Sequence, residues 1–445
     1  MKKIVIFIFS FYLLFADVVN ENNLDVLKSL DINENFLFYK PLEKKYNEYY
    51  YRKKHYFLNV LENGFEFLPI IKKSILKSNI PKSLISVALA ESYLNLDAKS
   101  HKKAIGLWQF MPQTAKIFGL RIDEYVDERR DAIKSTNAAI KYLKYLHDFF
   151  GKWYLAIMAY NAGEARIVEA VVRAKVDKLC HELGKNCQKD KKIKEYRKII
   201  RDYQREGKKK FAPLYKLYKK LSFVNIDLED LLRFQKGLKR QYLPKETRDY
   251  ILKILALSFL LNNDEFIKYS NAYIFNNSVT PRLAKVYVPA GTSLYYVARF
   301  LHISYKKLRE NNLQLKYAFT PPYKYYIYIP YKKLAFFKSH FKGKRRFLYV
   351  YRVKKGDTLL KIAKMYGIKV RMIRDYNRLG KFLRVNQKLI IPLNERFVKY
   401  RVKPGDTLNK IALRFGISYK KIKRINGLKN NVITVGQILK IPQKL

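Results

Sequence analysis

The sequence predicts an α+β multidomain protein, in which a mostly α-helical domain is followed by small strand–helix–helix–strand modules. Its 445 residues are enough for about three domains. From 45 to 149, apolar residues recur at helical spacing, as in Leu58, Leu61 and Phe65. Beyond 262 the chain repeats a pattern with a period of about 50 residues, which is typical of an array of small modules.

The first residues predict a secretory signal peptide at 1–16. Lys2 and Lys3 precede an apolar run that is shorter than the roughly 20 residues of a membrane span, and the small residue Ala16 follows it. No cysteine ends this run, so a lipid anchor is not indicated, and an uncleaved signal peptide stays open as an anchor. We therefore expect an exported protein in the periplasm or cell envelope of a Gram-negative bacterium. Residues 17–44 are polar, and we expect them to form a lead-in or tether.

One acidic residue, Glu91, stands at the end of a predicted apolar helix. Leu84, Val87 and Ala88 form a stripe at helical spacing. Glu91 falls on the same stripe, so its carboxyl should point inward. Burial disfavours the ionised form of a carboxylic acid and raises its pKa, which is how a glycosidase keeps a protonated carboxyl beside a sugar groove. For the Glu-Ser dipeptide alone, an ordinary solvated side chain is the alternative.

Three further segments follow in order, at Gly106–Pro112, Ala159–Glu164 and Glu246–Tyr250. With these motifs, residues 45–262 resemble the catalytic domain of the lytic transglycosylases of the soluble-lytic-transglycosylase type. The resemblance implies a mostly α, lysozyme-like fold that acts on peptidoglycan, with Glu91 as the sole catalytic acid and base.

The same resemblance implies roles for other side chains around Glu91. Tyr160 and Tyr250 are expected to donate hydrogen bonds to the carboxyl, with a role as ordinary core tyrosines as the alternative. The residues that it assigns to sugar binding or to the pocket wall are Ser100, Gln109, Tyr160, Asn161 and Tyr250.

The motifs supply one carboxylate, whereas a glycoside hydrolase generally needs two. Asp97 and the stretch 126–131 hold other acids, but the latter resembles a charged turn before a helix expected at 135–149. The resemblance therefore implies non-hydrolytic cleavage of the β-1,4 bond between N-acetylmuramic acid and N-acetylglucosamine, which closes a 1,6-anhydro ring. A hydrolytic muramidase and a non-catalytic peptidoglycan-binding scaffold are the alternatives.

Between the last two motifs lies an elaborated insert, 165–242, which is rich in lysine and arginine and has a helix expected at 196–203. A lid, a partner-docking insert and a solvated elaboration are the hypotheses for it, the last being the default. Cys180 and Cys187 predict a local disulfide in an oxidising compartment, with free thiols as the alternative. The six histidines are scattered, and we expect no metal site and no cofactor.

The repeats lie at 349–393 and 398–443, and a degenerate copy at 285–331 lacks the aspartate of the first loop. In each full copy an Asp-Thr pair should cap the first helix, and a glycine should end it in the left-handed conformation. The copies resemble LysM domains, which implies that they bind N-acetylglucosamine-containing chains in a shallow groove between two loops. The residues that the resemblance assigns to this groove are Gly356, Asp357, Thr358, Asn377, Gly405, Asp406, Thr407 and Asn426.

A formal net charge of +54 raises the hypothesis of nucleic-acid binding. The basic residues are spread along the whole chain, no nucleic-acid-binding motif accompanies them, and the chain is predicted to be exported. We therefore expect peptidoglycan glycan strands as the partner and no nucleic acid. Association with the envelope membrane or with anionic lipopolysaccharide stays open, as do protein partners, oligomeric state and the choice between internal and terminal cleavage.

Overall fold

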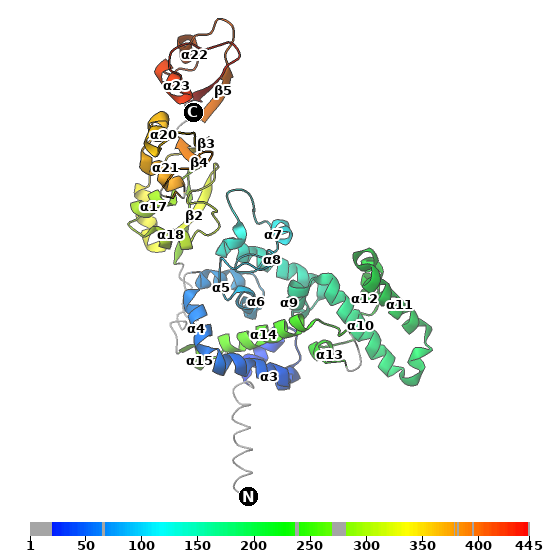
Figure 1. Ribbon diagram of the computed structural model, residues 1–445. Helices are drawn as coiled ribbons and strands as arrows, with labels where there is room; N and C mark the ends of the chain where they lie inside the picture. Colours follow the sequence, from blue (N-terminus) through cyan, green and yellow to red (C-terminus); the bar gives the residue numbers. More distant parts are fainter. Residues whose placement is uncertain are drawn as a thin grey trace. The chain divides into compact units, whose positions relative to one another are not determined.

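The structure is a computed structural model that describes residues 20–64, 67–235, 240–268, 282–377, 379–380, 382–393 and 396–443. These residues form two compact units (Figure 1). The first unit takes its residues from Met1–Leu120 and Arg129–Thr280, and the second from Arg121–Glu128 and Pro281–Leu445. The signal peptide predicted at 1–16 lies outside the described residues.

Helices make up the described part of the chain up to residue 268, apart from loops and isolated bridges. In chain order they are α2 (Glu21–Ser29), η1 (Glu34–Phe38), α3 (Lys40–Asn47), η2 (Glu48–Arg52), α4 (Lys54–Asn63), α5 (Leu68–Leu76), η3 (Lys82–Leu84), α6 (Ile85–Ser92), α7 (Pro112–Ile117), η4 (Glu128–Arg130), α8 (Ala132–Phe150), α9 (Trp153–Ala162), α10 (Glu164–Glu182), η5 (Gly184–Gln188), α11 (Lys191–Glu206), η6 (Gly207–Lys210), α12 (Phe211–Lys220), α13 (Leu228–Leu232), α14 (Lys245–Leu261) and α15 (Asp264–Lys268).

Helix α14 is the centre of the first unit. From Tyr250 to Leu261 its side chains are buried apart from the half-buried Lys253, as expected of a helix that is apolar on nearly all sides. It packs against α2, α3, α6 and α9, which come from distant parts of the sequence (Figure 1). The helix therefore fixes the relative positions of α6 and α9, which carry two of the motifs, and of its own motif at Glu246–Tyr250.

The prediction of a polar lead-in or tether at 17–44 is wrong for its described part. Residues 20–44 form α2, η1 and the start of α3, and α2 and α3 pack on α14. Val26, Leu27 and Leu30 are buried because they share one face of α2. This segment is therefore part of the helical domain.

The insert predicted at 165–242 is a set of helices that pack against one another. Helices α10, α11 and α12 lie side by side (Figure 1). Between them the fully buried carboxylate of Glu169 pairs with Arg166 at 2.5 Å and Arg240 at 2.9 Å, and it accepts a hydrogen bond from Gln204. A buried carboxylate with several partners specifies one arrangement, because removing one partner leaves a buried charge uncompensated.

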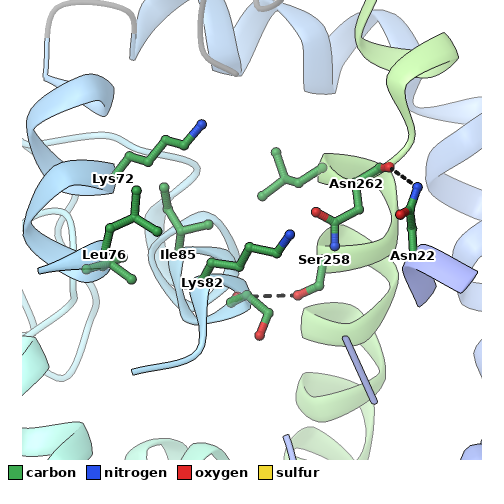
Figure 2. Close-up of a pocket in the computed structure, with 10 residues that line it drawn as sticks. Asn22, Lys72, Leu76, Lys82, Ile85, Ser258 and Asn262 are labelled. Atoms are coloured by element: carbon green, nitrogen blue, oxygen red, sulfur yellow. Dashed lines mark hydrogen bonds between the residues drawn. The ribbon is translucent and has the colours of Figure 1, made fainter. Parts of the chain in front are cut away.

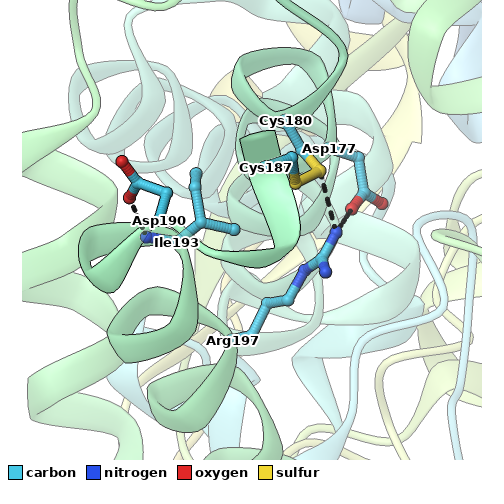
Figure 3. The surroundings of a disulfide bond; sticks show 6 residues. All are labelled: Asp177, Cys180, Cys187, Asp190, Ile193 and Arg197. Carbon is cyan, nitrogen blue, oxygen red and sulfur yellow. Dashed lines mark hydrogen bonds and ion pairs between the residues drawn. A yellow bond between two sulfur atoms is a disulfide. The ribbon is translucent and has the colours of Figure 1, made fainter. Parts of the chain in front are cut away.

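The predicted disulfide between Cys180 and Cys187 is confirmed, and it closes the turn after α10 with Cα atoms 4.9 Å apart. Figure 3 shows the guanidinium of Arg197, from α11, between the bridge and Asp177. Its Nη2 lies 3.2 Å from the sulfur of Cys180 and 3.6 Å from the carboxylate of Asp177. The bridge and the arginine together join the end of α10 to α11.

The second unit contains three strand–helix–helix–strand modules, so the predicted fold class is confirmed. Each module pairs its two strands in an antiparallel ribbon. The strands are β1 (Leu283–Val288), β2 (Tyr325–Pro330), β3 (Phe347–Arg352), β4 (Lys388–Leu393), β5 (Arg396–Arg401) and β6 (Ile438–Gln443). The helices are α17 (Leu294–Phe300), α18 (Tyr305–Glu310), η7 (Tyr331–Lys333), α19 (Leu334–His340), α20 (Leu359–Tyr366), α21 (Val370–Tyr376), α22 (Leu408–Arg414) and α23 (Tyr419–Asn426).

The helix caps predicted for the two full repeats are present. The hydroxyl of Thr358 accepts a hydrogen bond from the backbone N–H of Lys361 at 3.1 Å, and Thr407 does the same for Lys410 at 3.2 Å. Gly367 ends α20 with φ at 64°. Because each cap satisfies backbone groups at a helix end, helices of this short length hold their shape.

The charged turn predicted at 126–131 does precede a helix, and its charges are buried. Asp131 caps α8 by accepting hydrogen bonds from the backbone N–H groups of Ile133 and Lys134, so the helix begins before 135. Glu128, only 1% exposed, belongs to the second unit, where its carboxylate accepts a hydrogen bond from the hydroxyl of Tyr325 at 2.8 Å. The polar character of this stretch thus reflects internal hydrogen bonding.

Gly106, in the loop before α7, is tightly packed, whereas Gly119, which follows α7, is not. Both Gly106 and Gly119 have positive φ, at 84° and 87°. A Cβ on Gly106 would lie 2.0 Å from the carbonyl oxygen of Arg129, whereas one on Gly119 meets nothing within 4 Å. We expect Gly106→Ala to lower the free energy of unfolding by about 3 kcal/mol or more, and Gly119→Ala by only about 1 kcal/mol of backbone strain. Urea-induced unfolding measures both, and equal losses would contradict the packing described.

Candidate active site

The site is built on the end of α6, where Glu91 lies. From Ile85 to Ala90 the helix is buried, and Tyr93 ends it in the left-handed conformation with φ at 50°. The hydroxyl of Ser92 donates a hydrogen bond to the carbonyl oxygen of Leu107 at 2.8 Å. The serine beside Glu91 therefore ties the helix end to the segment Gly106–Pro112.

Glu91 is half-buried, and its carboxyl is surrounded by protein. Burial raises its pKa to about 7, against the lowering effects of the Tyr250 hydrogen bond and the positive charge of Lys253. The charge of Glu246 raises the pKa slightly further. A carboxyl with a pKa near 7 is present in both protonation states near neutral pH, so it can donate a proton and later accept one.

Tyr250, from α14, is the residue in direct contact with the acid. Its hydroxyl donates a hydrogen bond to Oε1 of Glu91 at 2.6 Å. Burial raises the pKa of Tyr250 well above its ordinary value, and the nearby Glu91 adds to this effect. The phenol therefore keeps its proton and remains a donor, which fixes the orientation of the carboxyl. Of the two tyrosines expected to bond Glu91, this one does so.

Lys253 is a site residue that the sequence analysis missed. Its ammonium donates a hydrogen bond to the carbonyl oxygen of Ala90 at 2.6 Å and lies 4.3 Å from the centre of the Tyr93 ring. It follows Tyr250 by three positions, so the two side chains share one face of α14. That spacing was the signal in the sequence that could have identified it.

Tyr160 and Asn161 lie at the end of α9, in the motif Ala159–Glu164. The hydroxyl of Tyr160 donates to the carbonyl oxygen of Trp108 at 2.7 Å, so it bonds the loop and not the acid. Burial raises the pKa of Tyr160 well above its ordinary value, and the charge of Glu91 adds to this effect. The side-chain oxygen of Asn161 accepts a hydrogen bond from Thr247 of α14 at 3.0 Å.

Ser100 and Gln109 lie in one tight loop beside the site. The hydroxyl of Ser100 accepts a hydrogen bond from the backbone N–H of Ala104 at 3.0 Å, and the side chain is exposed. The amide of Gln109 donates to the carbonyl oxygens of Ala98 and Gly106. Both residues thus take part in the internal hydrogen bonds of the loop that Ser92 joins to α6.

In the repeats, the aspartates and asparagines assigned to the groove have internal partners. Asp357 accepts hydrogen bonds from the hydroxyl of Tyr351 and the backbone N–H of Lys354, both at 2.7 Å. Asn377 joins α21 to β4 by bonds to Ile373 and Ile390. The matching residues, Asp406 and Asn426, make the equivalent bonds in the last module.

Gly356 and Gly405 complete these loops at their exposed tips, with φ at 79° and 77°. Thr358 and Thr407, the helix caps described above, are exposed as well. The backbone of both loops is therefore accessible.

Two other carboxylates of this unit have surroundings that differ from those of Glu91. Asp97 pairs with Arg130 at 2.8 Å, and Glu246 is exposed in the first turn of α14. Figure 2 shows a cavity of about 250 Å³, with Lys72 and Lys82 on one side and Ser258 on the other; Glu91 is not among the residues that line it. Within the described residues, no group of three or more His, Cys, Asp or Glu side chains is placed to hold a metal ion.

Parts of the chain match three known domain families. The transglycosylase SLT domain matches residues 69–178, and the LysM domain matches 351–392 and 400–442. The LysM-like domain of lytic transglycosylase MltD matches 282–342. Over 362 residues the chain is 26% identical to the membrane-bound lytic murein transglycosylase D of Escherichia coli, which covers 77% of this chain and 67% of that protein.

Two solved structures share a smaller part of the chain. The spore cortex-lytic enzyme SleL of Bacillus megaterium is 31% identical, covers 22% of this chain and 23% of its own, and has a TM-score of 0.14. SleL of Bacillus cereus is 26% identical, with the same coverage and a TM-score of 0.12. Within the described residues of this chain, no helix is both long and apolar enough to cross a membrane.

The raised pKa of Glu91 predicts a pH-dependent effect on stability. Because the folded state holds this proton more tightly than the unfolded chain, the free energy of unfolding falls as the pH rises from about 4.5 to about 7, and Glu91 is ionised in both states above that range. Glu91→Gln removes this cost, so we expect it to raise the free energy of unfolding by about 1 to 3 kcal/mol at pH 8.5 and to have little effect at pH 4.

Glu246→Gln is the matched control, since Glu246 is exposed. Urea-induced unfolding of both variants at the two pH values is the measurement. A Glu91→Gln variant with the same change in stability at both pH values would rule out a buried, proton-retaining carboxyl.

Proposed function

We propose a reaction for this chain on the premise that it is a lytic transglycosylase, composed of an SLT catalytic domain and LysM-type peptidoglycan-binding modules. In this proposal Glu91 is the sole acid and base, and the enzyme cleaves the β-1,4 bond between N-acetylmuramic acid and N-acetylglucosamine without water. The observation that supports it best is the enclosed carboxyl of Glu91, with its pKa of about 7 and the hydrogen bond from Tyr250 at 2.6 Å.

In the first step Glu91, in its protonated form, donates its proton to the oxygen that links the two sugars. The bond from this oxygen to the anomeric carbon of the muramyl residue breaks, and the N-acetylglucosamine side leaves as an alcohol. The muramyl N-acetyl group stabilises the positive charge at the anomeric carbon. Ser100 and Gln109 are the residues that we assign to the N-acetyl sugars, since their loop is joined to α6 beside the acid.

In the second step the ionised Glu91 removes the proton from the 6-hydroxyl of the muramyl residue. This oxygen forms a bond to the anomeric carbon, which closes the 1,6-anhydro ring, and Glu91 recovers the proton that it gave away. Tyr250 stabilises the ionised form between the steps, because a hydrogen bond to a carboxylate is stronger than one to a carboxylic acid. Lys253 adds a positive charge that favours the same form.

A hydrolytic reaction would require a second carboxylate near the acid. Glu246 is the carboxylate whose charge acts on Glu91, and it is exposed at the first turn of α14. We therefore take it as the candidate for the second carboxylate of a muramidase mechanism. In the anhydro mechanism Glu246 has no chemical role, so its substitution separates the two reactions.

For the rest of the chain we propose export to the periplasm, where the net charge of +54 favours contact with anionic envelope material. The LysM modules hold glycan strands, and two weak sites on one chain raise the effective concentration of an insoluble substrate around the enzyme. The exposed loops at Gly356 and Gly405 are the parts of these modules that we assign to glycan.

Digestion of purified murein tests the reaction. We expect soluble products with 1,6-anhydro ends, lighter by one water than the products of a muramidase. Glu91→Gln should lower the rate by at least about 100-fold, because it removes the proton donor and acceptor. Glu246→Gln should cleave murein at close to the normal rate and give the same products.

Mass spectrometry of the released muropeptides identifies the products, and their rate of release gives the activity. Products heavier by one water would favour the muramidase. Full activity of Glu91→Gln would contradict the assignment of the acid.

A further inference from the structure

We propose that the LysM-like module at 282–342 is an internal dock for the chain's own polypeptide and not a third glycan-binding module. The proposal deepens the function above, because it assigns glycan binding to the two LysM modules alone. We call the loops Ala290–Leu294 and Ala318–Pro321 of this module the dock loops. They occupy the place of the two loops that would flank a glycan in a LysM domain.

The dock loops are covered by residues from outside the module. The carbonyl oxygen of Ala290 accepts a hydrogen bond from the backbone N–H of Arg346 at 2.8 Å. The hydroxyl of Tyr376, on α21 of the next module, donates to the carbonyl oxygen of Gly291. A Cβ on Gly291 would lie 2.7 Å from the carbonyl oxygen of Arg346, so the chain passes directly over this turn.

The contact of Tyr376 is extensive. Only 7% of this residue is exposed, and its ring stacks on Phe319 of the dock loops with centroids 5.1 Å apart. Beside it, Asp375 pairs with Arg299 of α17 at 2.8 Å. A glycan could enter only if these buried groups lost their partners, which is unfavourable unless the ligand replaced every bond.

Among the described residues, nothing covers the corresponding turns of the two LysM modules. Gly356 and Gly405 hold the same place in the repeat as Gly291, and all three have positive φ. Both are exposed, and a Cβ on either would meet nothing within 4 Å. The position of Tyr376, directly before the structural asparagine, is held in the last module by Ile425, which has no hydroxyl. The same backbone turn is thus covered at Gly291 and open to solvent at Gly356 and Gly405.

The LysM-like module binds a second piece of the chain, the segment Arg121–Glu128. The backbone N–H of Asp127 donates a hydrogen bond to the carbonyl oxygen of Gln314 at 2.8 Å. The backbone N–H of Lys316 donates one to the carbonyl oxygen of Tyr125, also at 2.8 Å. The buried carboxylate of Glu128 accepts the hydroxyl hydrogen bond of Tyr325. Backbone pairing and a fully buried carboxylate are features of a polypeptide interface, and they support a docking role for the module.

Hydrogen–deuterium exchange of the full chain, with and without the N-acetylglucosamine hexamer as probe, tests the proposal. We expect the hexamer to slow exchange around Gly356 and Gly405 and to leave the dock loops unchanged. Tyr376→Ile replaces the tyrosine by isoleucine, the residue at the matching position 425 of the last module. This variant should speed exchange at Arg346 and in the dock loops by about tenfold. Tyr331→Ile, at an exposed tyrosine of the LysM-like module, is the matched control and should change exchange neither at Arg346 nor in the dock loops.

Slower exchange in the dock loops on adding the hexamer would overturn the proposal, as would unchanged exchange at Arg346 in Tyr376→Ile. If the hexamer slows exchange neither in the dock loops nor around Gly356 and Gly405, the glycan-binding role of the LysM modules fails. In that case the result for Tyr376→Ile still decides whether the module is a dock.

Discussion

The hydrogen bond from Tyr250 to Glu91 joins the two helices on which the site depends. Its length of 2.6 Å requires α14 and α6 to keep one fixed separation. That separation is set by the core, because α14 is buried over most of its length and packs on α2, α3, α6 and α9. A close-packed interior resists small displacements, so the core and the acid are parts of the same constraint.

The electrostatics of the site follow from this constraint. Burial alone would keep Glu91 protonated, and such a group is a poor base. Tyr250 and Lys253 oppose burial, and the balance leaves the pKa at about 7. A single carboxyl can then act as acid and as base in one cycle, because neither protonation state is strongly disfavoured near neutral pH. The face of α14 that carries both residues therefore supplies a large part of the chemistry.

The sequence predicted the features that have a strong local signal. Glu91 follows from an apolar stripe, and the threonine and glycine caps of the repeats follow from their fixed places in the pattern. The role of residues 20–44 was missed because polar residues surround a short apolar stripe, whose partner, α14, is more than two hundred residues away. The hydrogen bond of Glu128 was missed for a related reason, since its partner Tyr325 comes from a distant segment. Lys253 had a local signal, its place three residues after Tyr250 on α14, but its partner Ala90 is equally distant in the sequence.

Titration of the Glu91 carboxyl by carbon-13 NMR, in the full chain, measures whether this acid keeps its proton up to neutral pH. We expect a midpoint near pH 7, and a higher midpoint in Tyr250→Phe, because that variant loses a hydrogen bond that favours the ionised form. A midpoint near 4.5, the ordinary value for a glutamate, would show an acid open to water and would contradict the mechanism.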